Sequence, residues 1–168
     1  MNLEDINSIS SIIGTLAIVL TLIILARDLR QNTKTLRANM AREAGNGIQA
    51  WYSAIGNNQN SAELWTKGMA NPDNLSQAEL LQFFFLIQSI FWVFQTNLYL
   101  SKEGSLDSAI ETSISNVVLA VKDQPGFQVY WKQRKDIFFP EFKEHIDKLL
   151  TKKGSNFNMG YSIPIKDE

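Results

Sequence analysis

His145 is the only histidine of this 168-residue chain, and Glu141 precedes it by one helical turn. A carboxylate at that spacing can orient an imidazole ring, as acid–base and metal chemistry require. No nucleophile or second metal ligand stands at a suitable spacing from this pair. Acidic residues alternate with Lys143 and Lys148 along the same segment, which is typical of a solvated helix face. We therefore expect His145 to lie on the protein surface.

The composition excludes several other kinds of chemistry. The chain has no cysteine, which rules out disulfides, thiolate nucleophiles, cysteine zinc sites and iron–sulfur ligation. It contains neither of the glycine motifs that bind nucleotide phosphates. The formal net charge is −1 without an extended basic face, which argues against nucleic acid as the main partner. The sequence therefore predicts a protein that is not an enzyme, with no catalytic residue, cofactor or metal.

A further group of polar residues lies in or next to an apolar segment, which runs from Ile6 to Ala26 without a charged side chain. As a helix, this segment is about 30 Å long, roughly the thickness of a hydrocarbon core. Small and polar residues recur along it at alternating spacings of three and four, interrupted by Ile24. This stripe consists of Asn7, Ser10, Gly14, Ala17, Thr21 and Asp28.

The stripe predicts contact between transmembrane helices. Small residues and interhelical hydrogen bonds mark such contacts in lipid, and a seven-residue period implies a left-handed bundle of parallel copies. We expect a homo-oligomer, in which Asp28 pairs with Arg27 or Arg30 at the membrane edge. The alternative is an oligomeric ion channel in which Thr21 and Asp28 line a pore. The spacing also arises by chance, because Gly, Ser and Thr are common in membrane helices.

The charges on either side of the apolar segment predict its orientation. Residues 1–26 carry two acids and no base, whereas five bases follow within sixteen residues. The positive-inside rule then places the N-terminus outside and the rest of the chain in the cytoplasm. The acidic N-terminus and the absence of an Ala-x-Ala site argue against a cleaved signal peptide. Residues 1–30 are therefore predicted to be a transmembrane anchor, with the lipid bilayer and other copies as partners. The five bases are Arg27, Arg30, Lys34, Arg37 and Arg42.

The remainder of the sequence predicts an all-α fold. One long helix is expected from about Glu4 to about Ala54, continuing the anchor into the cytoplasm. Further helices are expected over 61–68, 77–102, 105–122, 127–137 and 140–152. The second of these follows a capping box at Ser76 and Glu79, and the last begins at Pro140. A turn is expected at 123–126. We predict a cytoplasmic helical domain over 31–153 and a C-terminal tail over 154–168 that is unstructured by composition.

Residues 80–101 form a second apolar run without a charged side chain. One interpretation is the buried central helix of a bundle, and the other is a second membrane span or an interfacial helix. A second span would place the many Lys and Arg of 102–153 outside, against the positive-inside rule. The sequence therefore favours the core helix.

Two motifs carry a resemblance to a known group of proteins. The first is Leu29-Arg30-Gln31-Asn32-Thr33, directly behind the apolar helix, and the second is Pro125-Gly126-Phe127 with Tyr130-Trp131 and Phe139-Pro140-Glu141-Phe142. Together they resemble an uncharacterised family of small bacterial membrane proteins with one N-terminal membrane helix and a helical cytoplasmic domain. Tyr130 departs from the tryptophan usual there, and Gln95 from a frequent acid. The resemblance implies a bacterial inner membrane and no known activity, so no functional residue is transferred.

Overall fold

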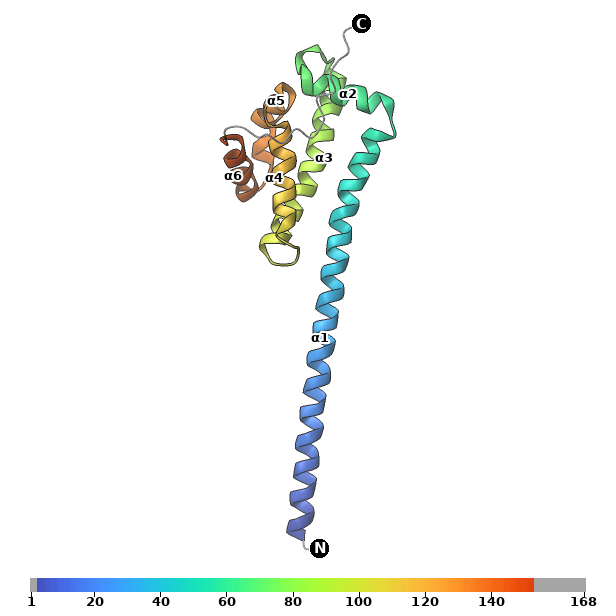
Figure 1. The fold of residues 1–168 in the computed structure, drawn as a ribbon, viewed down its shortest axis with the longest axis vertical. Coiled ribbons are helices and arrows are strands. Elements are labelled where there is room, and N and C mark those ends of the chain that lie inside the picture. The colour runs from blue at the N-terminus through green and yellow to red at the C-terminus, as the bar shows by residue number, and fades with distance from the viewer. Residues whose placement is uncertain (1–2, 153–168) are drawn as a thin grey trace. The chain divides into compact units, whose positions relative to one another are not determined.

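The computed structural model describes residues 3–152, and it contains only helices over that range. The all-α prediction is confirmed (Figure 1). Residue 153 and the tail predicted over 154–168 lie outside the described residues. The elements in chain order are α1 (Leu3–Gly56), α2 (Gln59–Ala70), η1 (Pro72–Asn74), α3 (Gln77–Lys102), α4 (Ala109–Val121), α5 (Pro125–Arg134), η2 (Lys135–Ile137) and α6 (Pro140–Leu150).

The chain divides into two compact units after Met40, and α1 runs through the division. We call residues 3–40 the anchor segment and residues 41–152 the helical domain. The predicted boundary at residue 30 lay just behind the apolar stretch, whereas burial begins along α1 at Met40. Met40 is half-buried and Ala44 is buried, while residues 31–39 are exposed throughout.

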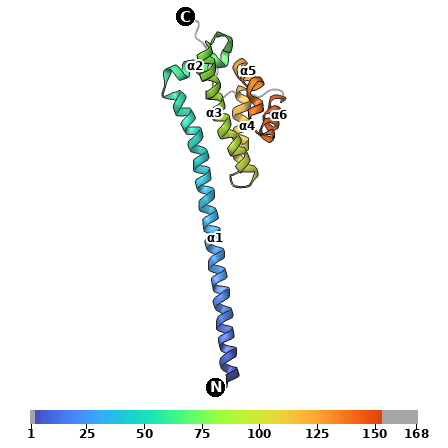
Figure 2. The same cartoon turned by 180° about the vertical axis from the view of Figure 1, so that it is seen from behind.

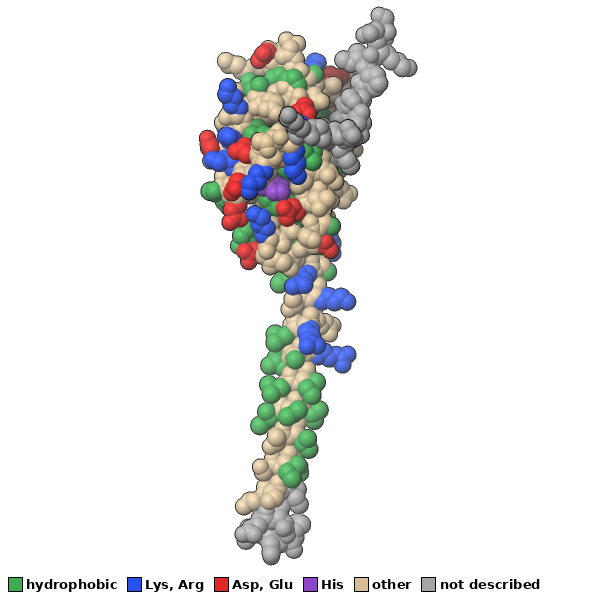
Figure 3. Space-filling view, turned by 60° about the vertical axis from the view of Figure 1, so that its left-hand side comes forward, with side chains coloured by type: hydrophobic (Ala, Val, Ile, Leu, Met, Phe, Trp, Pro, Cys, Tyr) green, Lys and Arg blue, Asp and Glu red, His purple; other side chains and the backbone are tan. Residues whose placement is uncertain are grey.

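The anchor segment is a single helix that is long and apolar enough to cross a membrane. No residue of its most apolar 18-residue stretch is buried within the chain. Figure 3 shows apolar side chains covering this part of the helix and Lys and Arg side chains following it. An exposed apolar surface of this length is compatible with insertion into a bilayer.

Local sequence chemistry sets several helix ends in the helical domain. The Ser76 hydroxyl accepts a hydrogen bond from the Glu79 amide at 3.3 Å, and the Glu79 carboxylate accepts one from the Ser76 amide at 2.8 Å. This is the predicted capping box at the start of α3. Gly104 follows α3 with a φ of 69°, a left-handed conformation that glycine adopts without a steric penalty. The next helix, α4, begins at Ala109, which is later than the predicted start at residue 105.

The turn predicted at 123–126 is wrong in its second half. Helix α5 begins at Pro125, whose fixed φ and missing amide hydrogen suit the first position of a helix. Gly126 is buried in the first turn of α5. The helix ends at Arg134 and is followed by the 3-10 turn η2. Pro140 begins α6, as predicted.

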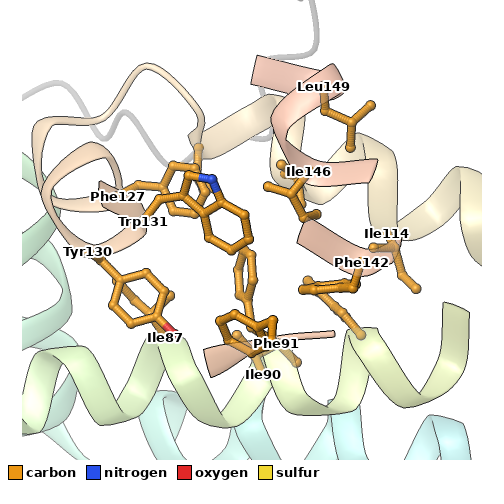
Figure 4. Packing of buried hydrophobic residues seen from close by; sticks show 14 of the residues in the cluster. Ile87, Ile90, Phe91, Ile114, Phe127, Tyr130, Trp131, Phe142, Ile146 and Leu149 are labelled. Atoms are coloured by element: carbon orange, nitrogen blue, oxygen red, sulfur yellow. The ribbon is translucent and has the colours of Figure 1, made fainter. Parts of the chain in front are cut away.

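Helix α3 supplies the centre of the core, and it is also long and apolar enough to cross a membrane. Phe91 is 3 % exposed, and its ring lies against those of Phe127, Trp131 and Phe142 from α5 and α6 (Figure 4). One face of α3 remains uncovered, so the helix is not buried all round. The exposed apolar residues on it are Leu81, Phe85, Trp92 and Tyr99.

The end of α1 belongs to the helical domain and packs against α3, as both ribbon views show (Figures 1 and 2). The Trp51 indole donates a hydrogen bond to the Leu86 carbonyl at 2.7 Å. Nearer the anchor, Gly47 lies so close to Val93 that an added Cβ would be 3.1 Å from the valine methyl groups. These two contacts make residues 41–56 run antiparallel to α3.

Candidate functional site

The anchor segment holds all six residues of the predicted stripe, and each of them is exposed. The helical repeat places them along one side of α1. At Gly14, an added Cβ would meet no other atom within 4 Å. This position is therefore open to close approach by another helix, whose backbone would meet no side chain there.

The threonines near the stripe satisfy their hydroxyl groups within α1. The Thr21 hydroxyl donates to the Ala17 carbonyl at 2.8 Å, and the Thr15 hydroxyl donates to the Ser11 carbonyl at 2.9 Å. Because the hydroxyl hydrogens are used, only the oxygen lone pairs remain available. The Thr21 position can therefore enter a dry contact without an unsatisfied donor, and it can also offer oxygen to a cation.

Asp28 is exposed at the end of the stripe. The sequence led us to expect an ion pair with Arg27 or Arg30. Among the ion pairs of residues 3–152, none involves Asp28. Its carboxylate is therefore available for a partner outside this single chain.

His145 lies at the surface, as the sequence suggested, but its side chain is half-buried because the ring packs between α4 and α6. Its Nε2 lies 3.2 Å from the Ser115 hydroxyl, and its Nδ1 lies 3.7 Å from a carboxylate oxygen of Glu111. Glu141 does not orient the ring, because it pairs with Lys102 at 3.6 Å instead. Figure 3 shows the histidine surrounded by charged side chains of both signs.

The contact of His145 with a serine and a glutamate has the composition of a hydrolytic triad but not its hydrogen bonding. The Ser115 hydroxyl donates to the Glu111 carbonyl at 2.8 Å, so it has no hydrogen left for His145. With that hydrogen on the Glu111 carbonyl, Ser115 can bond to His145 only by accepting from a protonated Nε2, which is the reverse of nucleophile activation. Ser115 also lies inside a regular helix, whose amides are already bonded and offer no oxyanion hole.

Burial lowers the pKa of His145, and the nearby Glu111 carboxylate only partly opposes this shift. The neutral imidazole is thus favoured in the fold, where it joins α4 to α6. Sequence reasoning missed this contact. The one signal was that Glu111 and Ser115 lie one helical turn apart and so share a face. Nothing in the sequence showed that this face meets α6.

The described surface of the helical domain includes two grooves. One, of about 670 Å³, lies between α2 and α3 and has polar and apolar walls that include Lys67, Glu79 and Phe85. The other, of about 370 Å³, lies where α3 ends and α6 begins, beside Tyr99 and Phe139. The Glu79 carboxylate in the first groove is already engaged in the capping box. Ser61 and Glu63 also line the first groove, but the Glu63 carboxylate accepts a hydrogen bond from Gln59, and no hydrogen bond of residues 3–152 joins Ser61 to a carboxylate.

Over residues 3–152, no group of three or more His, Asp or Glu side chains is placed to hold a metal ion. The chain matches no protein-family model, no curated protein and no solved structure.

Proposed function

We propose that this chain is a non-enzymatic, single-pass membrane protein that assembles with copies of itself through the anchor segment. The observation that carries the proposal is the stripe of small and polar residues, which is exposed along an apolar helix of membrane length. Lipid gives no hydrophobic drive for helices to associate, so close packing and hydrogen bonds at small residues supply it. Gly14, Ala17 and Thr21 provide such a surface.

The proposal includes an orientation and a role for the helical domain. The bases after Ala26 favour a cytoplasmic helical domain and an external N-terminus. Placement in a bacterial inner membrane rests on the family resemblance. We assign the helical domain the role of an oligomerisation or interaction module, supported by the uncovered apolar face of α3. Phe85 and Tyr99 on that face are 54 % and 52 % exposed.

The first test is the variant Gly14→Leu. A leucine side chain at this open position would hold a neighbouring helix away, so we expect the association constant to fall about tenfold or more, equivalent to roughly 1.4 kcal/mol. Sedimentation equilibrium of the full-length protein in detergent measures this constant.

The matched control is Ala26→Leu, which adds a similar side chain on the side of α1 away from the stripe. It should leave the association constant close to that of the wild type. A monomeric wild-type protein would contradict the proposal. Equal weakening by both variants would show that the stripe is not the contact surface.

The alternative function is an oligomeric ion channel, favoured specifically by the absence of an ion pair at Asp28 in the described chain. Several copies would then form an acidic ring that concentrates cations at the mouth of a pore, with Thr21 further in along the same face. In this case Asp28→Asn should lower single-channel cation conductance, by about twofold or more, while the oligomer persists. Planar-bilayer recordings of purified protein provide the measurement.

The two functions differ in what the wild-type protein does in the bilayer. Absence of current from a protein that is oligomeric in detergent favours a dry contact over a pore. If Asp28→Asn leaves the cation current unchanged, Asp28 does not lie on the conduction path. Ile24 interrupts the polar stripe, and for this reason we place the dry contact first.

A further inference from the structure

A second surface of α1 continues beyond the membrane-length stretch. Four leucines and two asparagines recur on it at alternating spacings of three and four, which is the heptad spacing of a coiled coil. Each of the leucines is more than half exposed, and both asparagines are exposed. We call these six residues the leucine seam: Leu22, Leu25, Leu29, Asn32, Leu36 and Asn39.

The bases of the same segment lie on the other side of the helix. An α-helix turns by about 100° per residue, so the mean direction of the bases around the helix is roughly 150° from that of the leucine seam. These bases are Arg27, Arg30, Lys34 and Arg37. In heptad terms they occupy the outermost positions, the farthest from a partner helix. All four are exposed. A second copy placed against the seam would therefore meet uncharged side chains, most of them leucines, and would keep like charges apart.

Lipid does not account for the exposure of the later leucines of the seam. Leu29 and Leu36 follow Arg27, so they lie among charged residues that mark the end of the hydrocarbon region. Their exposed fractions are 58 % and 55 %, as high as those of the apolar residues within the anchor. An apolar row exposed to water, with charged residues on the opposite side of the helix, is typical of a surface that binds a protein partner.

The helix itself also needs such a partner. Residues 27–39 are helical although every one of them is exposed, and no ion pair of the described chain stabilises them. A helical segment without tertiary packing is only marginally stable in water. Helix α1 runs without a break from Leu3 to Gly56 and includes this segment.

We propose that residues 22–39 form a parallel, in-register coiled coil with a second copy of this chain, an inference that rests on the proposed self-assembly. Parallel orientation follows from anchors inserted in the same direction. Asn32 and Asn39 would each face their counterpart, and a polar pair inside such a seam favours one register at some cost in stability. Thr21 directly precedes Leu22, so the stripe adjoins the seam and both can take part in one broad contact.

The absence of native cysteine allows a direct test with single-cysteine variants of the full-length protein in native membranes. A disulfide needs Cβ atoms roughly 3.5–4.5 Å apart, which only facing positions of a symmetric pair provide. Under a mild oxidant, Leu29→Cys and Leu36→Cys should cross-link at least about fivefold more than Lys34→Cys and Arg37→Cys. Non-reducing gels measure the dimer fraction, and the two base positions are matched controls on the outer side.

A further variant, Gly14→Cys, separates this inference from the proposed function. Cross-linking at Gly14→Cys without preference for the seam over the base positions would overturn the coiled coil while self-assembly through the anchor stands. Uniform cross-linking at all four juxtamembrane positions would also overturn the coiled coil, since random collision would cross-link every side of the helix equally. A wild type that is monomeric, with no variant cross-linking, would overturn both. Preference for the seam positions supports the coiled coil.

Discussion

Gly126→Ala is expected to destabilise the helical domain by at least about 3 kcal/mol, a large part of the ~5–15 kcal/mol typical of a whole domain. An alanine Cβ here would overlap the Gly68 carbonyl oxygen and would lie 2.8 Å from the Gly68 carbonyl carbon and 2.9 Å from the Met69 Cα. These are backbone atoms of α2, which cannot turn aside as a side chain can. At Gly126 the start of α5 thus meets the α2 backbone directly, and only glycine permits this approach.

Thermal unfolding of the full-length protein in detergent, followed by tryptophan fluorescence, provides the measurement. All four tryptophans lie beyond Met40, so the signal reports on the helical domain. The control is Gly45→Ala in α1, where an added Cβ meets nothing within 4 Å. That variant should be stabilised by about 0.5–1 kcal/mol, because alanine favours a helix interior over glycine. Similar behaviour of the two variants would show that α2 and α5 do not meet at Gly126.

Local chemistry explains which parts of the fold were predictable from sequence. The capping box of Ser76 and Glu79 and the proline at position 140 each act within one helical turn, so their sequence patterns identified helix starts correctly. The long apolar helix was equally evident from its length. Gly104 marked the end of α3 for the same local reason, its left-handed φ.

Contacts between distant elements explain what the sequence did not predict. Pro125-Gly126 is compatible with either a turn or a helix start, and the choice depends on the α2 backbone beside it. His145 lies in a polar helix and was predicted to be solvated, but α4 covers it with Ser115 and Glu111. Neither the contact of Gly126 with α2 nor the contact of His145 with α4 is predicted by a sequence pattern within a few residues.

The candidate site was predictable only as a pattern. The period of three and four identified one face of α1, and the structure adds that this face is open at Gly14. Which surface faces another copy depends on an assembly that a single chain does not contain. The strongest indication of the surface that faces another copy is the row of bases opposite Leu29 and Leu36. A second copy packed on the side of the bases would bring like charges together.

The orientation of α3 leads to the second large expected effect. The segment 80–101 is apolar almost all round, so its sequence period does not show which face is inward. The structure assigns Phe91 to the inside and Phe85, on the same helix, to the outside at 54 % exposed. The Phe91 ring is in contact with six other rings, those of Phe94, Phe127, Tyr130, Trp131, Phe138 and Phe142.

Phe91→Ala should therefore cost about 3–5 kcal/mol, because it leaves a cavity at the point where α3, α5 and α6 meet. Phe85→Ala removes the same side chain from a position that is more than half exposed, and surface changes usually stay within about 0.5 kcal/mol. Denaturant titration of both full-length variants, monitored by tryptophan fluorescence, compares the two free energies of unfolding. Equal losses would mean that a partner covers Phe85 as closely as the core covers Phe91. A larger loss at Phe85 would mean that α3 is rotated from the orientation described, since a side chain more than half exposed cannot contribute more than a buried one.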